Sequence, residues 1–120
     1  MRVRLGVLLA LTACAPSRPV SGPGKLASGE IQQVVRTNFG RFRMCYEEGL
    51  RWNPHLGGRV ATYFVIESDG RVTRQEDRGS DLPDRDVVAC VVNNFGSLHF
   101  PNPEGGFVTV VYPIVFSPGE

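Results

Sequence analysis

The cysteines are the residues of this sequence with the widest range of possible chemistry. The chain of 120 residues has three of them, Cys14, Cys45 and Cys90. A cysteine can carry a lipid, form a disulfide, bind a metal or act as a nucleophile, and its surroundings decide between these uses. The two histidines that could assist them, His55 and His99, stand among loop-forming residues. No C-x-x-C, G-x-S-x-G or glycine-rich phosphate loop organises these side chains.

The first cysteine follows a short export signal. Arg2 and Arg4 form a positively charged start, and an apolar run over residues 5–11 follows. This layout is typical of a secretory signal, and the run is too short for a membrane-spanning helix, which needs about 20 apolar residues. The stretch LTAC, residues 11–14, resembles the lipobox of bacterial lipoproteins. That resemblance implies cleavage before Cys14, a lipid on Cys14 and, because alanine rather than aspartate follows it, delivery to the outer membrane.

Cys45 and Cys90 then remain as an even pair in an oxidising compartment, where disulfides form and persist. Each lies on the apolar stripe of a predicted helix, and helices packed on one sheet could bring the two sulfurs within bonding distance. We therefore predict a disulfide between Cys45 and Cys90. The alternative is that one of them is a nucleophile with a histidine base, although a thiol buried on an apolar stripe is inert.

The acidic residues make a weaker case for a metal site. Four aspartates lie close together in the chain, at Asp77, Asp81, Asp84 and Asp86. Their spacing does not match the calcium loop D-x-[DN]-x-[DN]-G, and helix capping accounts for Asp81 or Asp84 without a metal. We predict no metal and no cofactor. Loss of the signal's two arginines leaves 11 of the 13 basic residues against 12 acidic ones, so no nucleic acid or other polyanion is expected as a partner.

Two helices are predicted from apolar periodicity. The first runs for about twenty residues from a cap at Ser28 to just before Asn53, with Gly40 as a place for a bend. The second begins in the stretch 81–84 and ends at Gly96. Their apolar stripes comprise Ile31, Val34, Val35, Phe42, Cys45, Tyr46 and Leu50 in the first, and Val87, Val88, Cys90, Val91, Val92 and Phe95 in the second.

Three strands are predicted, over residues 59–66, 71–79 and 107–116. Asp-Gly at residues 69–70 is a strong hairpin signal between the first two, and the second strand is polar, which is typical of an edge. Pro113 cannot donate a ladder hydrogen bond, so the last strand is also expected at an edge or at a bulge. Such an edge could accept a partner's strand, unless Pro113 serves to block that pairing. The residues proposed for this contact are Val108, Thr109, Val110, Val111 and Tyr112.

The order helix, strand, strand, helix, strand predicts an α+β domain with two helices packed on a three-stranded antiparallel sheet. The predicted organisation is a lipoprotein signal peptide over residues 1–13, a lipidated cysteine with a flexible tether over 14–27, and one domain over 28–118. The tether is inferred from a composition rich in Pro, Gly, Ser and Ala, which cannot bury a core.

Several stretches carry a family resemblance. FGRFRMCYEEGL, GGRVATYFVIESDGRV, VVACVVNNFGSLHFP and GGFVTVVYPIVFSP resemble the gliding-motility AgmX/PglI C-terminal domain of myxobacteria, which is itself similar to the TonB C-terminal domain. The match covers residues 29–118, and its most specific parts are Cys45-Tyr46-Glu47 and Cys90. The resemblance implies a TonB-C-terminal-like fold and a periplasm-facing protein-interaction domain. Unlike TonB, the chain has no spanning helix and no long Pro-rich arm, so the resemblance implies no use of proton-motive force.

We therefore interpret the chain as a non-enzymatic lipoprotein of the cell envelope, held by its lipid in the outer membrane and facing the periplasm. Its domain is expected to act as a protein–protein interaction or scaffolding module, in an assembly for motility, transport or secretion, with an envelope protein as partner. Two alternatives stay open: a small cysteine-dependent hydrolase or redox enzyme of the periplasm, and a structural lipoprotein without a specific partner.

Lipidation can be tested directly at Cys14. Because the acyl chains would be the membrane anchor, Cys14→Ser should release the protein from membranes or block its processing. Fractionation of cells that express each form measures this, together with incorporation of a labelled fatty acid. Absence of label from the wild-type protein would contradict the lipoprotein interpretation.

Overall fold

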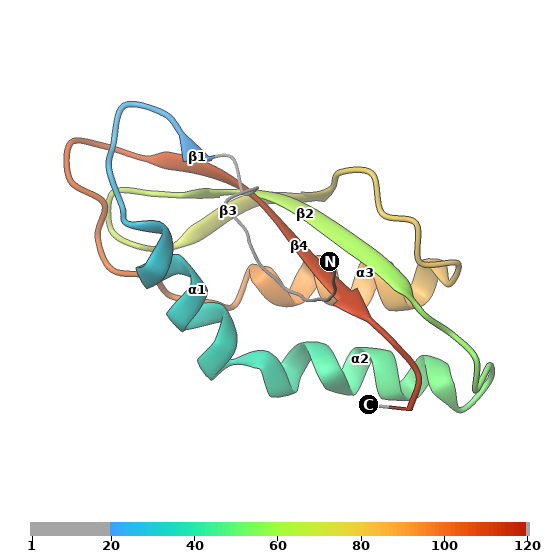
Figure 1. Ribbon diagram of the computed structural model, residues 1–120. Coiled ribbons are helices and arrows are strands. Elements are labelled where there is room, and N and C mark those ends of the chain that lie inside the picture. The colour runs from blue at the N-terminus through green and yellow to red at the C-terminus, as the bar shows by residue number, and fades with distance from the viewer. Residues whose placement is uncertain (1–19, 120) are drawn as a thin grey trace, which may run out of the picture.

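The protein folds as one antiparallel sheet with a layer of helices on a single face (Figure 1). The computed structural model describes residues 20–119, so Cys14, the predicted signal and residues 14–19 of the predicted tether lie outside the described residues. The strand order is β1-β4-β2-β3, from β1 (Val20–Ser21), β2 (Gly58–Ile66), β3 (Val72–Asp77) and β4 (Val108–Phe116). The helices are α1 (Ser28–Thr37), α2 (Phe39–Leu50) and α3 (Arg85–Phe95). The predicted α+β class is confirmed.

The two central strands, β2 and β4, pair over their whole length. Their register is continuous from Gly58 opposite Phe116 to Ile66 opposite Val108. Because side chains alternate along a strand, one face of the pair carries the buried apolar residues and meets the helices. Those inward residues are Val60, Thr62, Phe64 and Ile66 of β2, and Val108, Val110, Tyr112, Ile114 and Phe116 of β4. Both predicted apolar faces are confirmed.

Strand β3 lies at the edge of the sheet, as its polar sequence predicts. The predicted turn at Asp69-Gly70 joins it to β2. Gly70 has φ 88°, a left-handed conformation that glycine adopts without steric cost, and a Cβ there would lie 2.1 Å from the carbonyl oxygen of Phe100. A bulge near Arg74, where φ is 59°, interrupts the pairing of β3 with β2.

The predicted single helix of about twenty residues is wrong, because the chain forms two helices that meet at Asn38. The backbone of Asn38 has φ −104° and ψ 14°, outside the helical range, and its Nδ2 donates to the carbonyl oxygen of Val34 at 2.8 Å. Asparagine side chains compete with the helix for backbone groups in this way. The direction therefore changes at Asn38 and not at Gly40.

Helix α3 begins at Arg85, just after the predicted start in residues 81–84, and an aspartate caps it as predicted. Asp84 is the N-cap, and its Oδ1 accepts hydrogen bonds from the backbone N–H groups of Asp86 and Val87 at 3.0 and 3.1 Å. These bonds satisfy two donors that the first helical turn leaves unpaired. Pro83 precedes the cap and so lies before the helix, not inside it.

A fourth strand, β1, corrects the predicted three-stranded sheet. It pairs antiparallel with β4 at Thr109 and Val110. Backbone hydrogen bonds extend this contact to Lys25, which exchanges two with Glu104 at 2.7 and 2.9 Å. The element order is therefore β-α-α-β-β-α-β, in place of the predicted α-β-β-α-β.

The predicted domain boundary at residue 28 is also wrong, because residues 20–27 belong to the domain. The small residues that suggested a flexible tether instead allow two backbones to approach closely. A Cβ on Gly24 would lie 2.0 Å from the carbonyl oxygen of Gly106, so only glycine fits at this position. Composition alone does not separate a flexible segment from one that needs such contacts.

Aromatic residues form the centre of the core between the sheet and the helices. The ring of Phe95 on α3 lies 4.7 Å from that of Phe42 on α2 and 4.9 Å from that of Phe64 on β2, measured between centroids. Three residues after Phe42 on α2, Cys45 is joined to Cys90 of α3 by a disulfide, with the two Cα atoms 5.7 Å apart. The predicted disulfide is confirmed in the structure.

This disulfide should account for a large share of the stability. It links residues that are 45 apart in sequence, and closing such a loop in the unfolded chain contributes about 4 kcal/mol in the chain-entropy treatment. For a domain of this size 1 kcal/mol moves the melting temperature by about 4–8 °C. Cys90→Ser, or reduction, should therefore lower the melting temperature by more than about 10 °C in a circular dichroism melt.

Cys14→Ser is the matched control, since it removes a cysteine without breaking the disulfide. It should leave the melting temperature unchanged. Peptide mapping without reductant on protein taken from the cell envelope checks the pairing itself. Two free thiols at Cys45 and Cys90 would contradict the disulfide and favour the cysteine-enzyme alternative.

Candidate functional site: the open part of strand β4

The residues predicted for partner binding lie on β4, but the first of them are not at a free edge. In the sheet β4 lies between β1 and β2. Val20 faces Val110 and Ser21 faces Thr109, with the two hydroxyl oxygens of Ser21 and Thr109 2.7 Å apart. The predicted edge is therefore wrong at Thr109 and Val110, because β1 occupies their outer side. Of the predicted set Val108, Thr109, Val110, Val111 and Tyr112, the last two lie beyond this pairing.

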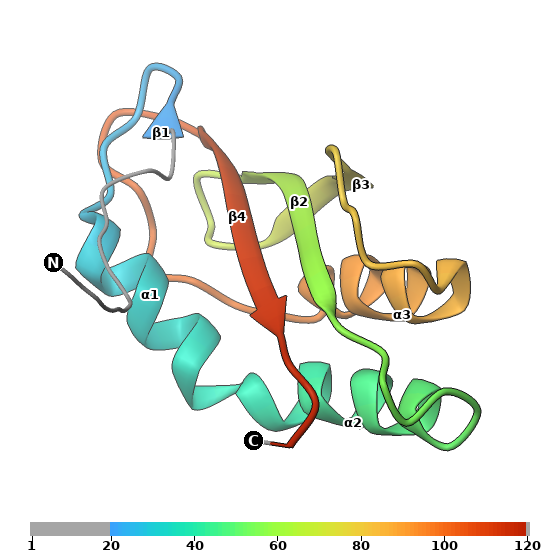
Figure 2. The ribbon, with the colours of Figure 1, turned by 45° about the vertical axis from the view of Figure 1, so that its right-hand side comes forward.

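Strand β1 covers only the start of β4. Past Val110, no strand of the described residues 20–119 pairs with the outer side of β4, which continues to Phe116. Figure 2 shows β4 running on well past β1 toward the end of the chain. The candidate site is this uncovered part, Val111 to Phe116, which we call the open edge.

The hydrogen bonds of Ala61 on β2 establish which backbone groups face the open edge. The N–H of Ala61 donates to Ser80 Oγ at 2.9 Å, and its carbonyl accepts from the N–H of Arg78 at 2.7 Å. Both groups thus point away from β4, although Ala61 lies opposite Pro113. In an antiparallel ladder the two members of such a pair do not bond each other, so the carbonyl of Pro113 points away from β2.

Residues two before and two after Pro113 share its orientation. The N–H and C=O groups of Val111 and Val115 therefore point to the open side, beside the carbonyl of Pro113. Pro113 costs the sheet no ladder bond with β2, and it removes one donor from the open edge. A proline in the interior of a nine-residue strand is explained by this position.

A small groove follows the open edge where it passes α2. Its volume is about 80 Å³. The ring centroids of Tyr46 and Phe116 are 4.8 Å apart, and the Tyr46 hydroxyl donates to the carbonyl of Leu56 at 2.6 Å. The side chain of Val115 is 70 % exposed, which is unusual for a valine on a central strand. The groove is lined by Phe39, Arg43, Tyr46, Val115, Phe116 and Ser117.

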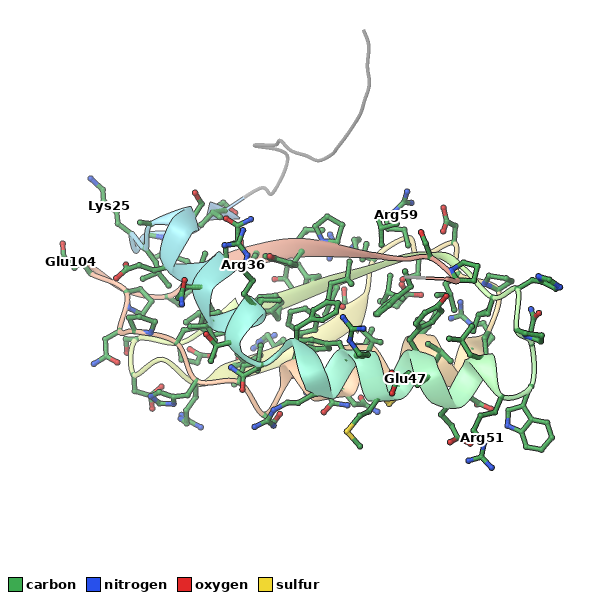
Figure 3. The ribbon with its side chains drawn as sticks, turned by 60° about the horizontal axis from the view of Figure 1, so that its bottom comes forward. Lys25, Arg36, Glu47, Arg51, Arg59 and Glu104 are labelled. Carbon is green, nitrogen blue, oxygen red and sulfur yellow. A yellow bond between two sulfur atoms is a disulfide. The ribbon has the colours of Figure 1, made fainter. Side chains whose placement is uncertain are left out.

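The charge beside the groove comes from arginine. The guanidinium carbon of Arg43 lies 5.6 Å from the ring centroid of Phe39, a cation–π contact. Arg36 projects from α1 on the side of the molecule that carries β1 and β4 (Figure 3). Neither arginine forms an ion pair within residues 20–119. The sequence did not point to Phe39 and Arg43, because only the fold brings the start of α2 to the end of β4.

The other chemically interesting residues are used in local structure. Asp77 Oδ1 accepts from the backbone and hydroxyl of Ser80, and Asp81 Oδ1 accepts from the N–H of Arg59 at 2.6 Å. Asp84 caps α3. Among the residues that the structure describes, no group of three or more His, Cys, Asp and Glu is placed to hold a metal ion.

The pKa values of Asp69 and Asp77 are lowered by local hydrogen bonds of the same kind. Hydrogen bonds from Arg71, whose side chain donates to Asp69 at 2.7 Å, hold the pKa of Asp69 below its usual value. The hydroxyl of Ser80 is the largest cause of the lowered pKa of Asp77. Both carboxylates stabilise turns next to β3, and neither lines the groove at the open edge.

Comparisons with known proteins found no family model and no curated protein that matches the chain, so the resemblance to the AgmX/PglI domain stays a prediction. No helix within the described residues is long and apolar enough to cross a membrane. Two solved structures are similar, both at low sequence identity. The TonB C-terminal domain of Helicobacter pylori, residues 179–285, matches at 18% identity and a TM-score of 0.44, covering 80% of this chain and 98% of that one. The TonB C-terminal domain of Pseudomonas aeruginosa matches at 16% identity and a TM-score of 0.46, covering 88% of this chain and 91% of that one.

Proposed function

We propose that this protein is a non-enzymatic lipoprotein of the cell envelope whose domain binds another polypeptide by accepting one of its strands. The observation that carries the proposal is the open edge of β4. The backbone groups of Val111 and Val115 and the carbonyl of Pro113 face outward there without a strand partner among residues 20–119. An added strand would obtain affinity by forming backbone hydrogen bonds with such groups.

The groove beside the open edge supplies selectivity. Side chains of an added strand alternate between the two faces of the sheet, so every second one would turn toward the layer that holds α2. There it would meet Phe39 and Arg43, which line the groove. An apolar or acidic side chain fits this position best, since the groove offers aromatic rings and a cation without an ion-pair partner within the described residues.

The predicted lipid would hold this edge near the membrane. Five residues separate Cys14 from Val20 at the start of β1. An extended chain spans at most about 3.5 Å per residue, so the anchor would lie within roughly 20 Å of β1 and of the β4 edge. We propose the outer membrane, with the domain on its periplasmic side, and an envelope protein as the partner.

The disulfide supports the non-enzymatic interpretation. The cysteine-dependent alternative needs a free thiolate at Cys45 or Cys90, whereas the two sulfurs are bonded to each other in the structure. A structural lipoprotein without a partner would have no use for an open edge next to a groove, and the following experiment distinguishes it.

Strand addition predicts that the partner is lost when one outward N–H is removed. Val115→Pro removes the N–H of Val115, which does not bond to β2 because its opposite residue Arg59 uses its own backbone groups toward Asp81 and Leu82. Val115→Thr is the matched control, since it keeps the N–H and the β-branched shape. Tagged full-length protein should be crosslinked in intact cells and its partners identified by mass spectrometry. Wild type and Val115→Thr should capture the same protein, and Val115→Pro should not.

Equal capture by a folded Val115→Pro variant would exclude the open edge as the binding site. Folding is checked by near-ultraviolet circular dichroism of all three forms. Absence of any captured protein from all of them would favour the structural lipoprotein, and capture only of a second copy of the chain would identify self-assembly in place of partner binding.

A further inference from the structure

A second cavity lies in the helical layer, where α2 and α3 meet beside the disulfide. Its volume is about 200 Å³, and it shares no lining residue with the groove at the open edge. Its apolar lining residues are the cysteines of the disulfide, Val87 of α3 and Trp52, which follows the end of α2. None of these belongs to the proposed strand-binding site, so the function of this cavity is a separate question.

The walls of this cavity are held rigidly. At Gly49 the two helices come so close that a Cβ would lie 2.5 Å from Cγ2 of Val87. The Cys45–Cys90 bond joins the same two helices covalently next to this contact. A cavity whose walls are fixed before binding costs little ordering entropy when a ligand enters.

Trp52 is the most exposed of the large apolar side chains in the described part of the chain, with 81 % of its surface accessible. An indole this exposed adds little to the core, so packing does not explain why tryptophan occupies the position. An exposed tryptophan beside a rigid cavity is typical of binding surfaces. Tryptophan is enriched among the few interface residues that contribute most of the binding free energy.

The polar side chains that border the cavity are all carboxylates. Glu48, Asp84 and Asp86 line it, and no basic residue does. Glu48 Oε1 forms an exposed ion pair with a guanidinium nitrogen of Arg51 at 3.1 Å. Oδ1 of Asp84 accepts the hydrogen bonds that cap α3. The side chain of Asp86 has no hydrogen bond or ion pair within residues 20–119. Negative charge next to an aromatic face complements a cation with an apolar stem.

We propose that this cavity binds the side chain of an arginine presented by a partner polypeptide. The guanidinium would stack on the face of Trp52 and donate hydrogen bonds to Asp86 and Glu48. Its three methylene groups would contact Val87 and the disulfide, since the stem of arginine buries against apolar surface while the charged head stays near water. This cavity shares no lining residue with the groove at the open edge, so arginine binding can be tested separately from strand addition.

The sequence offers a direct probe, because Trp52 is the sole tryptophan of the chain. Its fluorescence can be followed in purified full-length protein during titration with the blocked peptide Gly-Gly-Arg-Gly-Gly. The same peptide with citrulline in place of arginine keeps the shape and removes the charge. The arginine peptide should shift the emission saturably, and the citrulline peptide should bind at least about fivefold more weakly. Added salt should weaken the binding of the arginine peptide and leave the binding of the citrulline peptide unchanged.

Variants locate the contact. Asp86→Asn and Glu48→Gln should each weaken binding of the arginine peptide by about two- to fivefold, and Trp52→Leu, measured by calorimetry, by a similar factor. Glu47→Gln is the matched control: Glu47 is also exposed on α2 but does not line the cavity, so affinity should not change (Figure 3). Equal binding of the citrulline peptide, no binding of the arginine peptide, or unchanged affinity in the first two variants would overturn the proposal.

Discussion

The pairing of β2 with β4 is the interaction on which the rest of the structure depends. Both outer strands attach to it, β3 to β2 and β1 to β4, and its inner face supplies the surface on which the helices pack. A slip of one residue would move Phe64 and its buried neighbours to the opposite face. The same slip would reverse the direction of the backbone groups at Val111 and Val115, so the core and the open edge depend on one register.

Packing onto that inner face also determines where the cysteines meet. The ring of Phe95 contacts those of Phe42 and Phe64. Cys45 lies three residues after Phe42 on α2, and Cys90 lies five residues before Phe95 on α3. The same packing of α2 against α3 brings Cys45 and Cys90 together, and their disulfide then restricts the unfolded chain. The groove and the cavity described above both lie beside α2: the groove where α2 meets β4, and the cavity where α2 meets α3.

The periodic spacing of apolar residues predicted much of this fold. The features that depend on single side-chain or backbone contacts were not predicted from the sequence. The apolar alternation of β2 and β4, the Asp-Gly hairpin and the stripes through Cys45 and Cys90 all depend on regular spacing, which a sequence displays directly. The break at Asn38 depends on one side-chain hydrogen bond, and β1 depends on the fit of Gly24 against Gly106. Contacts of that kind involve residues far apart in the chain. For the same reason Pro113 indicated an edge but could not show that a two-residue strand covers part of it.

Strand β4 is covered along only part of its outer edge. Such an edge could accept a chosen partner strand and still avoid pairing with every similar strand. A fully open strand of alternating valines would pair with any similar strand, and proteins limit such pairing with short edges, prolines and nearby charge. Here β1 covers the start of the strand, Pro113 removes one donor from the remainder, and Arg43 lies alongside. What is left is a short segment with few outward backbone groups, and a partner strand of the proposed kind would also have to fit the groove. In the proposed strand addition, specificity would arise from the groove, while the directional backbone bonds would set the register in which a partner strand is accepted.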